Sequence, residues 1–205
     1  MTIRYPNGKR YVPPTHKRKQ TSSQQSVVAF GNRGATLEEE LNDANDYYLT
    51  HHIAVIHKKP TPVQVVHVKY PSRSQAVITE AYYRTPSTTD YNGVWNGYYI
   101  DFEAKETKNK TSFPLQNIHE HQVEHMRAVY KQSGIVFFVF HFRSLNRYFV
   151  QFFKEFYPFW KRMKNGGRKS ITLQEIEETS IEITLGLAPR LPYLQAVQQY
   201  IKRER

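Results

Sequence analysis

The distribution of apolar residues predicts a sheet in the middle of the chain. Residues 135–142 (IVFFVFHF) form an almost continuous apolar run, which is typical of a strand buried on both faces. Residues 147–153 (RYFVQFF) suit an antiparallel neighbour of that strand. Further strands are expected at 52–58, 76–84 and 94–105. We therefore expect a sheet in which residues 135–142 form a central, buried strand.

An N-terminal helix is predicted from apolar residues that recur every three or four positions. Within residues 35–49, this spacing is kept by Leu37, Leu41, Ala44 and Tyr48, which would form a buried stripe. Acidic residues cover the rest of the segment. Most of them are expected to face solvent, and Glu38 could instead point into a catalytic cleft; the set is Glu38, Glu39, Glu40, Asp43 and Asp46.

Later helices are expected at 117–132, 154–164 and 192–203. The first of them lies between two expected strands, and this strand–helix–strand order predicts a right-handed crossover. Pro158 is expected to break or bend the second helix, because proline lacks the N–H that a helix interior needs. Residues 170–178 are compatible with a helix or with a strand followed by a turn.

A basic projection from the sheet is expected in residues 59–75 (KPTPVQVVHVKYPSRSQ). Its valines favour an extended chain, whereas its prolines argue against a central strand. No Asp or Glu occurs between Asp46 and Glu80. Positive charge therefore dominates this part of the chain, and it is carried by Lys58, Lys59, Lys69 and Arg73.

Composition narrows the class of partner. A chain of 205 residues suits one domain with a tail or a protruding insertion. Its formal net charge of +11 favours a polyanionic partner such as nucleic acid, through counterion release. The absence of Cys excludes disulfides, thiolate zinc sites and catalytic thiols. No apolar run approaches the ~20 residues of a spanning helix, and no secretory apolar segment begins the chain. We therefore expect a cytoplasmic protein with no membrane partner.

Residues 1–30 are expected to form a flexible, basic, DNA-binding arm. They combine Lys and Arg with Pro, Ser, Thr and Gln, and the first acidic residue of the whole chain is Glu38. Such a segment cannot offset its ordering entropy by burying apolar surface, so we expect it to become ordered on phosphate. Residues 31–205 would then form the domain. Arg33, just after the arm, is a candidate phosphate contact.

The candidate chemistry lies in residues 88–107 (TTDYNGVWNGYYIDFEAKET). Asp90 is followed by a polar, hairpin-like turn and by a strand that ends in Glu103 and Lys105. Period-2 geometry places Glu103 and Lys105 on one strand face, about 7 Å apart. Two carboxylates can hold a hard divalent cation, and a lysine can orient water or offset charge on a phosphorane. An Asp, a spacer and Glu-x-Lys in this order resemble the signature of restriction-endonuclease-like nucleases.

Neighbouring residues leave alternatives open within this site. Asp101 shares a strand face with Glu103, so one of the two could be a ligand and the other structural. The Glu-x-Lys spacing favours Glu103. Thr88 and Thr89 directly precede the first carboxylate, and a hydroxyl or carbonyl oxygen there could enter a Mg²⁺ shell.

The helix expected at 117–132 carries further polar residues. Gln122 could reach a metal or a water molecule from the first turn, although spacing alone favours a surface residue. His121 and His125 share a helix face, which is a spacing that zinc sites use. The segment between them (HQVEH) lacks the Glu of H-E-x-x-H, and a third ligand is not evident. A phosphate contact or a plain surface position is therefore favoured for the histidines, including His119.

Four segments of the chain resemble RecU Holliday junction resolvases. They are residues 3–11 (IRYPNGKRY), 31–42 (GNRGATLEEELN), 84–122 (RTPSTTDYNGVWNGYYIDFEAKETKNKTSFPLQNIHEHQ) and 189–194 (PRLPYL). The resemblance covers almost the whole chain in order. It implies an α/β fold with a restriction-endonuclease-like core, in which helices flank a mixed sheet, and a homodimer. It also implies a stalk, here at about 59–80, that inserts into a four-way junction.

The same resemblance implies roles for individual residues. Thr88, Asp90, Glu103 and Gln122 would surround Mg²⁺, which Mn²⁺ could replace, and Lys105 would stabilise the transition state. Glu38 would be a further acidic member of the cleft. The resemblance also places DNA contacts at Lys58 and Arg73. Arg33 and Lys69 are further expected DNA contacts on the basis of their charge and position.

The expected function is Mg²⁺-dependent, structure-selective resolution of Holliday junctions in recombination and DNA repair. The protein would be a crossover junction endodeoxyribonuclease that hydrolyses two phosphodiesters symmetrically. One rival is a sequence-specific restriction-type endonuclease on the same core. Another is a non-enzymatic DNA-binding modulator of the RecA recombinase. The resemblance itself implies modulation of RecA, so both roles could coexist.

Overall fold

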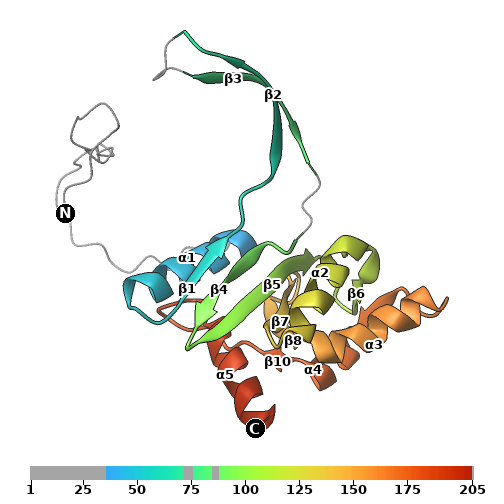
Figure 1. Cartoon of the computed structure of the whole chain (residues 1–205). Coiled ribbons are helices and arrows are strands. Elements are labelled where there is room, and N and C mark those ends of the chain that lie inside the picture. Colours follow the sequence, from blue (N-terminus) through green and yellow to red (C-terminus); the bar gives the residue numbers. More distant parts are fainter. Residues whose placement is uncertain (1–35, 72–75, 85–87, 205) are drawn as a thin grey trace. The chain divides into compact units, whose positions relative to one another are not determined.

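A computed structural model describes residues 36–71, 76–84 and 88–204 of the chain (Figure 1). The chain divides into two units, residues 1–34 and 35–205, and the elements described below all belong to the second unit. The arm expected at 1–30, together with Arg33 and Arg73, lies outside the described residues.

A six-stranded mixed sheet forms the centre of the fold, with the order β1-β4-β5-β7-β8-β10. β5 and β7 run parallel, and the other neighbouring strands pair antiparallel. The chain passes from β5 through a helix to the parallel strand β7, which is the strand–helix–strand order that the sequence predicts. The strands are β1 (Val55–Lys58), β4 (Tyr91–Trp95), β5 (Tyr98–Thr107), β7 (Ile135–Phe142), β8 (Arg147–Phe152) and β10 (Ile181–Glu182).

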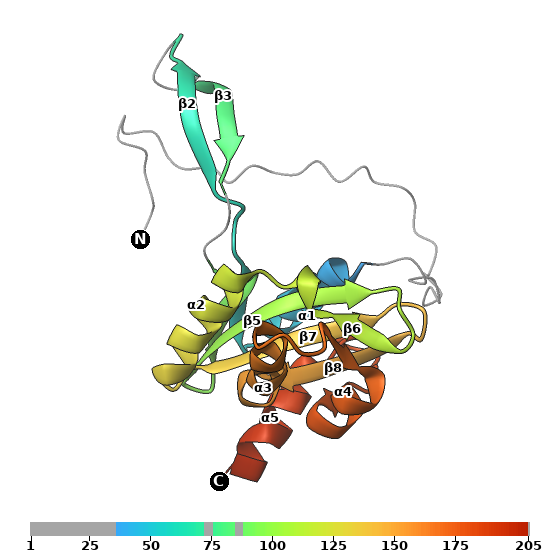
Figure 2. The same ribbon diagram turned by 90° about the vertical axis from the view of Figure 1, so that its right-hand side faces the viewer.

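Helices cover both faces of this sheet (Figures 1 and 2). Alternate residues of β7 point to opposite faces, so Phe137 and Phe138 enter two separate apolar clusters. The first cluster includes residues of α1 (Leu37–Thr50) and α5 (Tyr193–Glu204). The second includes residues of α2 (Glu120–Lys131), α3 (Phe153–Lys164) and α4 (Leu173–Thr179). The short elements β6 (Ser112–Pro114), η1 (Leu115–Asn117) and β9 (Ser170–Thr172) complete the second cluster. The expected α/β class is confirmed, and the layout is consistent with a restriction-endonuclease-like core.

The strand expected at 94–105 is in fact divided by a hairpin turn, so that its first two residues belong to β4 and residues from Tyr98 onward belong to β5. Asn96 and Gly97 have φ angles of +49° and +82° and separate β4 from β5. Two successive left-handed residues make the tight turn whose twist matches a β-hairpin, and Asn-Gly is its preferred sequence. The turn therefore interrupts the apolar segment that suggested a continuous strand.

The helix α3 runs from Phe153 to Lys164 without a break at Pro158. The hydrogen bond that Pro158 cannot donate would have reached the carbonyl of Lys154, in the first turn of the helix. Phe156 and Trp160 are buried on either side of the proline. The apolar anchoring therefore outweighs the single missing bond. Of the two predicted outcomes, a break or a bend, the break was wrong.

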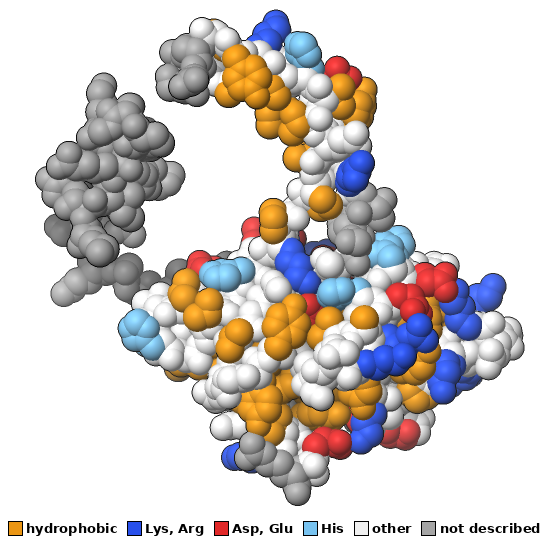
Figure 3. All heavy atoms as spheres, viewed as in Figure 1, with side chains coloured by type: hydrophobic (Ala, Val, Ile, Leu, Met, Phe, Trp, Pro, Cys, Tyr) orange, Lys and Arg blue, Asp and Glu red, His pale blue; other side chains and the backbone are white. Residues whose placement is uncertain are grey.

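The expected projection is a two-stranded antiparallel ribbon, β2 (Val63–Lys69) with β3 (Val77–Tyr83). The strand predicted at 76–84 is β3, and its partner is β2. The ribbon reaches Tyr83, beyond the end expected at about residue 80. All ribbon residues are exposed except Val68, which is half-buried. Hydrophobic side chains are visible along the ribbon in Figure 3. The ribbon therefore presents apolar and aromatic side chains to solvent together with Lys69.

Glu40 departs from the expectation that the acids of α1 are solvated. Its side chain is only 2% exposed, and its Oε1 accepts a hydrogen bond of 2.9 Å from Nε of Arg190. Glu38, Glu39, Asp43 and Asp46 are exposed as expected. Helical spacing could not separate Glu40 from them, because its partner is 150 residues away.

Replacing Arg190 with Met is expected to lower the free energy of unfolding by about 2 kcal/mol, because it leaves the buried Glu40 carboxylate without its cation. Equilibrium urea unfolding measures this difference. Arg127→Met is the matched control, since Arg127 pairs with Glu124 at a site where both side chains are about half exposed. The control should lose less than about 0.5 kcal/mol. Equal losses in the two variants would contradict a structural role for the Glu40 pair.

Candidate active site

Glu103 and Lys105 lie on one face of β5, as the period of the strand predicts. Lys105 Nζ is 2.8 Å from Glu103 Oε1. Glu103 is completely buried, whereas the Lys105 side chain retains 19% exposure. β5 lies between β4 and β7 in the sheet, so the backbone that carries these two side chains is held from both sides. The pair is therefore a rigid feature of the sheet.

Asp90 comes next to Glu103 through the hairpin register. Tyr91, the first residue of β4, pairs with Phe102 of β5, which places Asp90 opposite Glu103. The Asp90 N–H donates to Glu103 Oε2 at 3.1 Å, and Asp90 Oδ2 accepts a longer bond of 3.4 Å from the Ala104 N–H. The structure therefore brings together the two carboxylates that are thirteen residues apart in sequence.

Gln122 reaches the same carboxylate from the first turn of α2. Its Nε2 donates to Glu103 Oε1 at 2.5 Å, while its own Oε1 accepts from the His119 N–H at 3.0 Å. The crossover that connects β5 to β7 places this helix turn beside the strand. Spacing alone favoured a plain surface position for Gln122, and it is instead buried. In this geometry the amide nitrogen, and not the amide oxygen, faces Glu103.

Burial, followed by the negative charge of Asp90, raises the pKa of Glu103 to about 7 against the opposing effect of the Lys105 ammonium. The buried Glu103 carboxylate therefore ionises less readily beside Asp90 than it would in water. A cation bound between them would relieve this repulsion. The electrostatics of the site therefore favour a bound positive charge.

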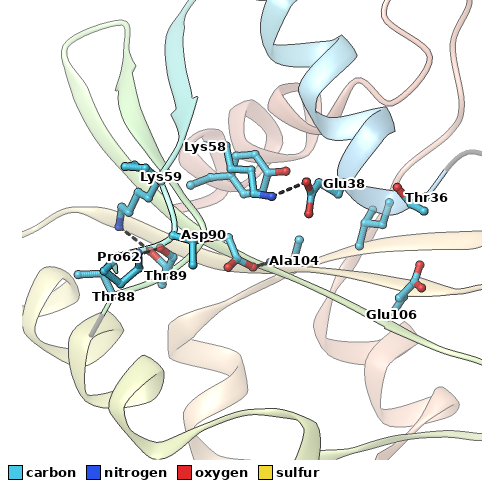
Figure 4. A pocket seen from close by; sticks show the side chains of 14 residues that line it. Thr36, Glu38, Lys58, Lys59, Pro62, Thr88, Thr89, Asp90, Ala104 and Glu106 are labelled. Atoms are coloured by element: carbon cyan, nitrogen blue, oxygen red, sulfur yellow. Dashed lines mark hydrogen bonds and ion pairs between the residues drawn. The ribbon is translucent and has the colours of Figure 1, made fainter. Parts of the chain in front are cut away.

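The remaining acidic and hydroxyl candidates line a cleft of about 520 Å³ in front of Asp90. Thr88, Asp90, Glu38 and Lys58 all contribute to its wall (Figure 4). Glu38 forms an ion pair with Lys58 across the cleft. Lys58 therefore lies at the candidate site, whereas Lys69 is on the ribbon.

The residues at this site fit a hard divalent cation. Asp90 and Glu103 supply carboxylate oxygens and Thr88 a hydroxyl, and oxygen donors are what Mg²⁺ prefers. Within the described ranges, no group of three or more His, Asp or Glu side chains is arranged to hold a metal ion. Mg²⁺ commonly binds through one or two carboxylates and completes its shell with substrate phosphate and water. The donor set here matches that mode of binding.

The three histidines of α2 do not converge. The rings of His119 and His121 stack with their centroids 5.5 Å apart, whereas His125 Nε2 is 3.2 Å from Oδ2 of Asp101. His125 thus contacts a buried carboxylate instead of sharing a zinc site with His121.

Asp101, Lys59 and Thr89 form a second buried polar group beside the carboxylates, and sequence reasoning missed its extent. Lys59 Nζ lies 3.0 Å from Asp101 Oδ2 and 2.8 Å from Thr89 Oγ1. Burial by itself would raise the pKa of Asp101, but bonds from His125 and Thr89 and the charge of Lys59 lower it below its usual value. The one available signal was that Asp101 shares a strand face with Glu103. Nothing in the spacing pointed to Lys59.

The part of the chain that the structure describes contains no helix long and apolar enough to cross a membrane.

The chain is similar over nearly its whole length to proteins of one family. The model of the RecU family, described as recombination protein U, matches residues 32–199. The chain is 56% identical to the Holliday junction resolvase RecU of Listeria monocytogenes serotype 4b over 204 residues, which cover 97% of this chain and 98% of the relative. It is 57% identical to that of Bacillus subtilis over 198 residues, covering 96% and 94%. It is 55% identical to that of Lactiplantibacillus plantarum over 201 residues, covering 98% and 97%.

Proposed function

The chain belongs to the RecU family, and from this premise we propose that it resolves Holliday junctions by Mg²⁺-dependent hydrolysis of phosphodiesters at Asp90, Glu103 and Lys105. The relatives over nearly the whole length are named Holliday junction resolvases, which supports an endonuclease that acts on four-way DNA. The observation that carries the site is the contact of Asp90 and Lys105 with one buried carboxylate, that of Glu103.

Mg²⁺ would be held by Asp90 and Glu103, with Thr88 as a further oxygen donor. When bound there, the ion polarises a phosphoryl oxygen and lowers the pKa of water. Mn²⁺ has the same ligand preference and could replace it.

The chain's own residues have distinct tasks in the reaction. Gln122 donates to Glu103 and fixes the orientation of its carboxylate. Lys105 carries a positive charge next to the Glu103 carboxylate, where it can offset charge that develops on the phosphoryl group. Water adds to phosphorus and the bond to the 3′ oxygen breaks, which leaves a 5′-phosphate and a 3′-hydroxyl. The Lys105 side chain is 19% exposed, which leaves part of it open to substrate.

DNA would reach this cleft along a basic route. The net charge of +11 favours phosphate binding in general. Lys58 lines the cleft itself, and Lys69 lies on the exposed ribbon. The ribbon suits insertion into the open centre of a junction, because its apolar and aromatic side chains are exposed and a junction offers unstacked bases.

We further propose that the protein acts as a homodimer. Resolution needs two cuts on strands of like polarity, and each chain described here offers one pair of catalytic carboxylates. Twofold symmetry of the enzyme would match the pseudo-twofold symmetry of the junction. Sedimentation in the presence of junction DNA measures the stoichiometry, and a 1:1 complex that cuts both strands would contradict the dimer.

A synthetic mobile four-way junction tests the proposed function. The wild-type protein is expected to cut it symmetrically in Mg²⁺ and to leave it intact in EDTA, because the proposed reaction needs the cation held by Asp90 and Glu103. Linear duplexes with the sequence of each arm are the control and should be cut far more slowly. Cleavage of the linear arms at a fixed site would favour a restriction-type endonuclease. Cleavage of the junction in EDTA at the same rate would exclude the metal site.

A further inference from the structure

Asp101 is a completely buried carboxylate that none of the steps above uses. It precedes Glu103 by two residues and points to the same face of β5. Four side chains contact its two oxygens. Oδ1 accepts a hydrogen bond from Thr89 Oγ1, and Oδ2 contacts Lys59 Nζ at 3.0 Å, Tyr99 OH at 3.0 Å and His125 Nε2 at 3.2 Å.

Two of these partners lead directly to the segment that carries Asp90. Thr89 is its immediate neighbour in the chain and is itself only 2% exposed. Lys59 is tied to the segment twice, since its backbone N–H donates to the Asp90 carbonyl at 2.7 Å and its ammonium donates to Thr89 Oγ1 at 2.8 Å. The Asp101 carboxylate therefore holds Thr89 directly and Asp90 through Lys59. The Asp90 side chain lines the cleft (Figure 4).

Lys59 is also the first residue after β1, and residues 59–62 lead from it into the ribbon. Lys59 and Pro62 line the same cleft as Asp90. Lys59, at the base of the ribbon, and Thr89, next to Asp90, thus both contact the Asp101 carboxylate.

A merely structural role does not account for this group well. A buried ion pair is usually no more stabilising than apolar residues of the same volume, since both charges must be desolvated. Hydrogen bonds to a fixed carboxylate do, however, fix the orientation of the groups that donate them, which apolar packing does not. The group lies next to Asp90, a proposed catalytic carboxylate whose orientation affects the reaction.

We infer that Asp101 is a positioning residue for the reaction: through Thr89 and Lys59 it fixes the Asp90 segment and couples it to the base of the ribbon. This inference rests on the proposed function for its catalytic consequence. Movement of the ribbon base on DNA would be transmitted to Asp90 through Lys59.

Thr89→Val and Thr89→Ser form a matched pair for the test. Valine has the shape of threonine without the hydroxyl, whereas serine keeps the hydroxyl and therefore the bond to Asp101. With protein in excess over a four-way junction in Mg²⁺, the single-turnover rate should fall by ~10–100-fold in Thr89→Val, as for loss of a supporting group, and stay within about threefold of wild type in Thr89→Ser. The junction Kd should change by less than about twofold in both, because neither variant removes a phosphate contact.

Lys59→Met tests the link to the ribbon. Lys59→Met and Thr89→Val act through the same carboxylate, so the double variant should be no slower than the slower single variant. If the double variant lost rate by the product of the two single-variant factors, Lys59 and Thr89 would not act through the same carboxylate. A loss of rate in Thr89→Val that serine does not restore, or that tracks a loss of junction binding, would overturn the positioning role.

Hydrogen exchange on the free protein, without metal or DNA, gives a readout that does not depend on cleavage. The Asp90 amide donates to Glu103 Oε2 and the Lys59 amide donates to the Asp90 carbonyl. Both amides should exchange at least about tenfold faster in Thr89→Val than in Thr89→Ser. Amides of β7 should be unchanged. Equal exchange at Asp90 and Lys59 in the two variants would overturn the inference. If the wild-type protein failed to cut junctions, the proposed function would fail, and exchange would still decide whether Asp101 holds the segment.

Discussion

Replacing Glu103 with Gln is expected to reduce the single-turnover rate of junction cleavage in Mg²⁺ by on the order of 10³-fold or more. The variant keeps the size of the side chain and removes the negative charge. Glu103 contacts Lys105, Gln122 and the Asp90 N–H, so the loss of charge weakens both the cation site and the orientation of its neighbours. Quenched-flow or manual sampling of a labelled four-way junction measures the rate.

Junction binding by this variant should persist, because Glu103 is buried and contributes repulsion, and no attraction, toward phosphate. A gel shift in EDTA measures the binding. Glu178→Gln is the control for the loss of one negative charge, since Glu178 is exposed on α4. Cleavage by Glu103→Gln at the wild-type rate would show that the reaction takes place elsewhere.

In metal-free protein, the same substitution is expected to stabilise the fold increasingly as pH rises. Burial and the Asp90 charge raise the pKa of Glu103 from 4.5 to about 7. Between these two values the native state binds more protons than the unfolded state, so the free energy of unfolding of the wild type falls with rising pH. The raised pKa corresponds to about 3 kcal/mol over the full window, at about 1.4 kcal/mol per unit of pH. Gln cannot ionise and does not lose this stability.

Urea unfolding of both proteins in EDTA, at several values between about pH 5 and pH 8, measures the difference. As pH rises, the variant should become more stable relative to wild type, and the difference in unfolding free energy should grow by about 3 kcal/mol over the full window. Adding Mg²⁺ should narrow the gap, because a cation that binds only the native wild type stabilises it by mass action. A gap that stays constant with pH would contradict the raised pKa. A gap that Mg²⁺ does not affect would contradict cation binding at Glu103.

Local patterns account for the parts of the site that lie on one element. The period of a strand places Glu103 and Lys105 on one face, and their 2.8 Å contact confirms it. The same rule indicated that Asp101 shares the face of Glu103. The apolar stripe of α1 and the buried strand at 135–142 were also readable from spacing, because burial of one helix face or of both strand faces leaves a repeating trace in the sequence.

Contacts between elements were beyond such patterns. Gln122 looked like a surface residue until the crossover placed the start of α2 against β5, and only the family resemblance drew attention to it. Glu40 looked like its solvated neighbours, because nothing in α1 reveals that Arg190 lies against it. Residues 76–84 have the pattern of a strand, but such a pattern does not state which strand will pair with it, and the partner is β2.

By itself, the sequence determined the secondary structure of the core, the abundance of positive charge and the face on which Glu103 and Lys105 meet. Only the tertiary structure decided that Asp90 lies opposite Glu103, that Gln122 touches the same carboxylate and that Lys59 shares the Asp101 carboxylate with Thr89. The reason is physical: side-chain direction follows from the repeat of a single helix or strand, whereas partners are set by hairpin register and crossover connections, which bring together residues far apart in the chain.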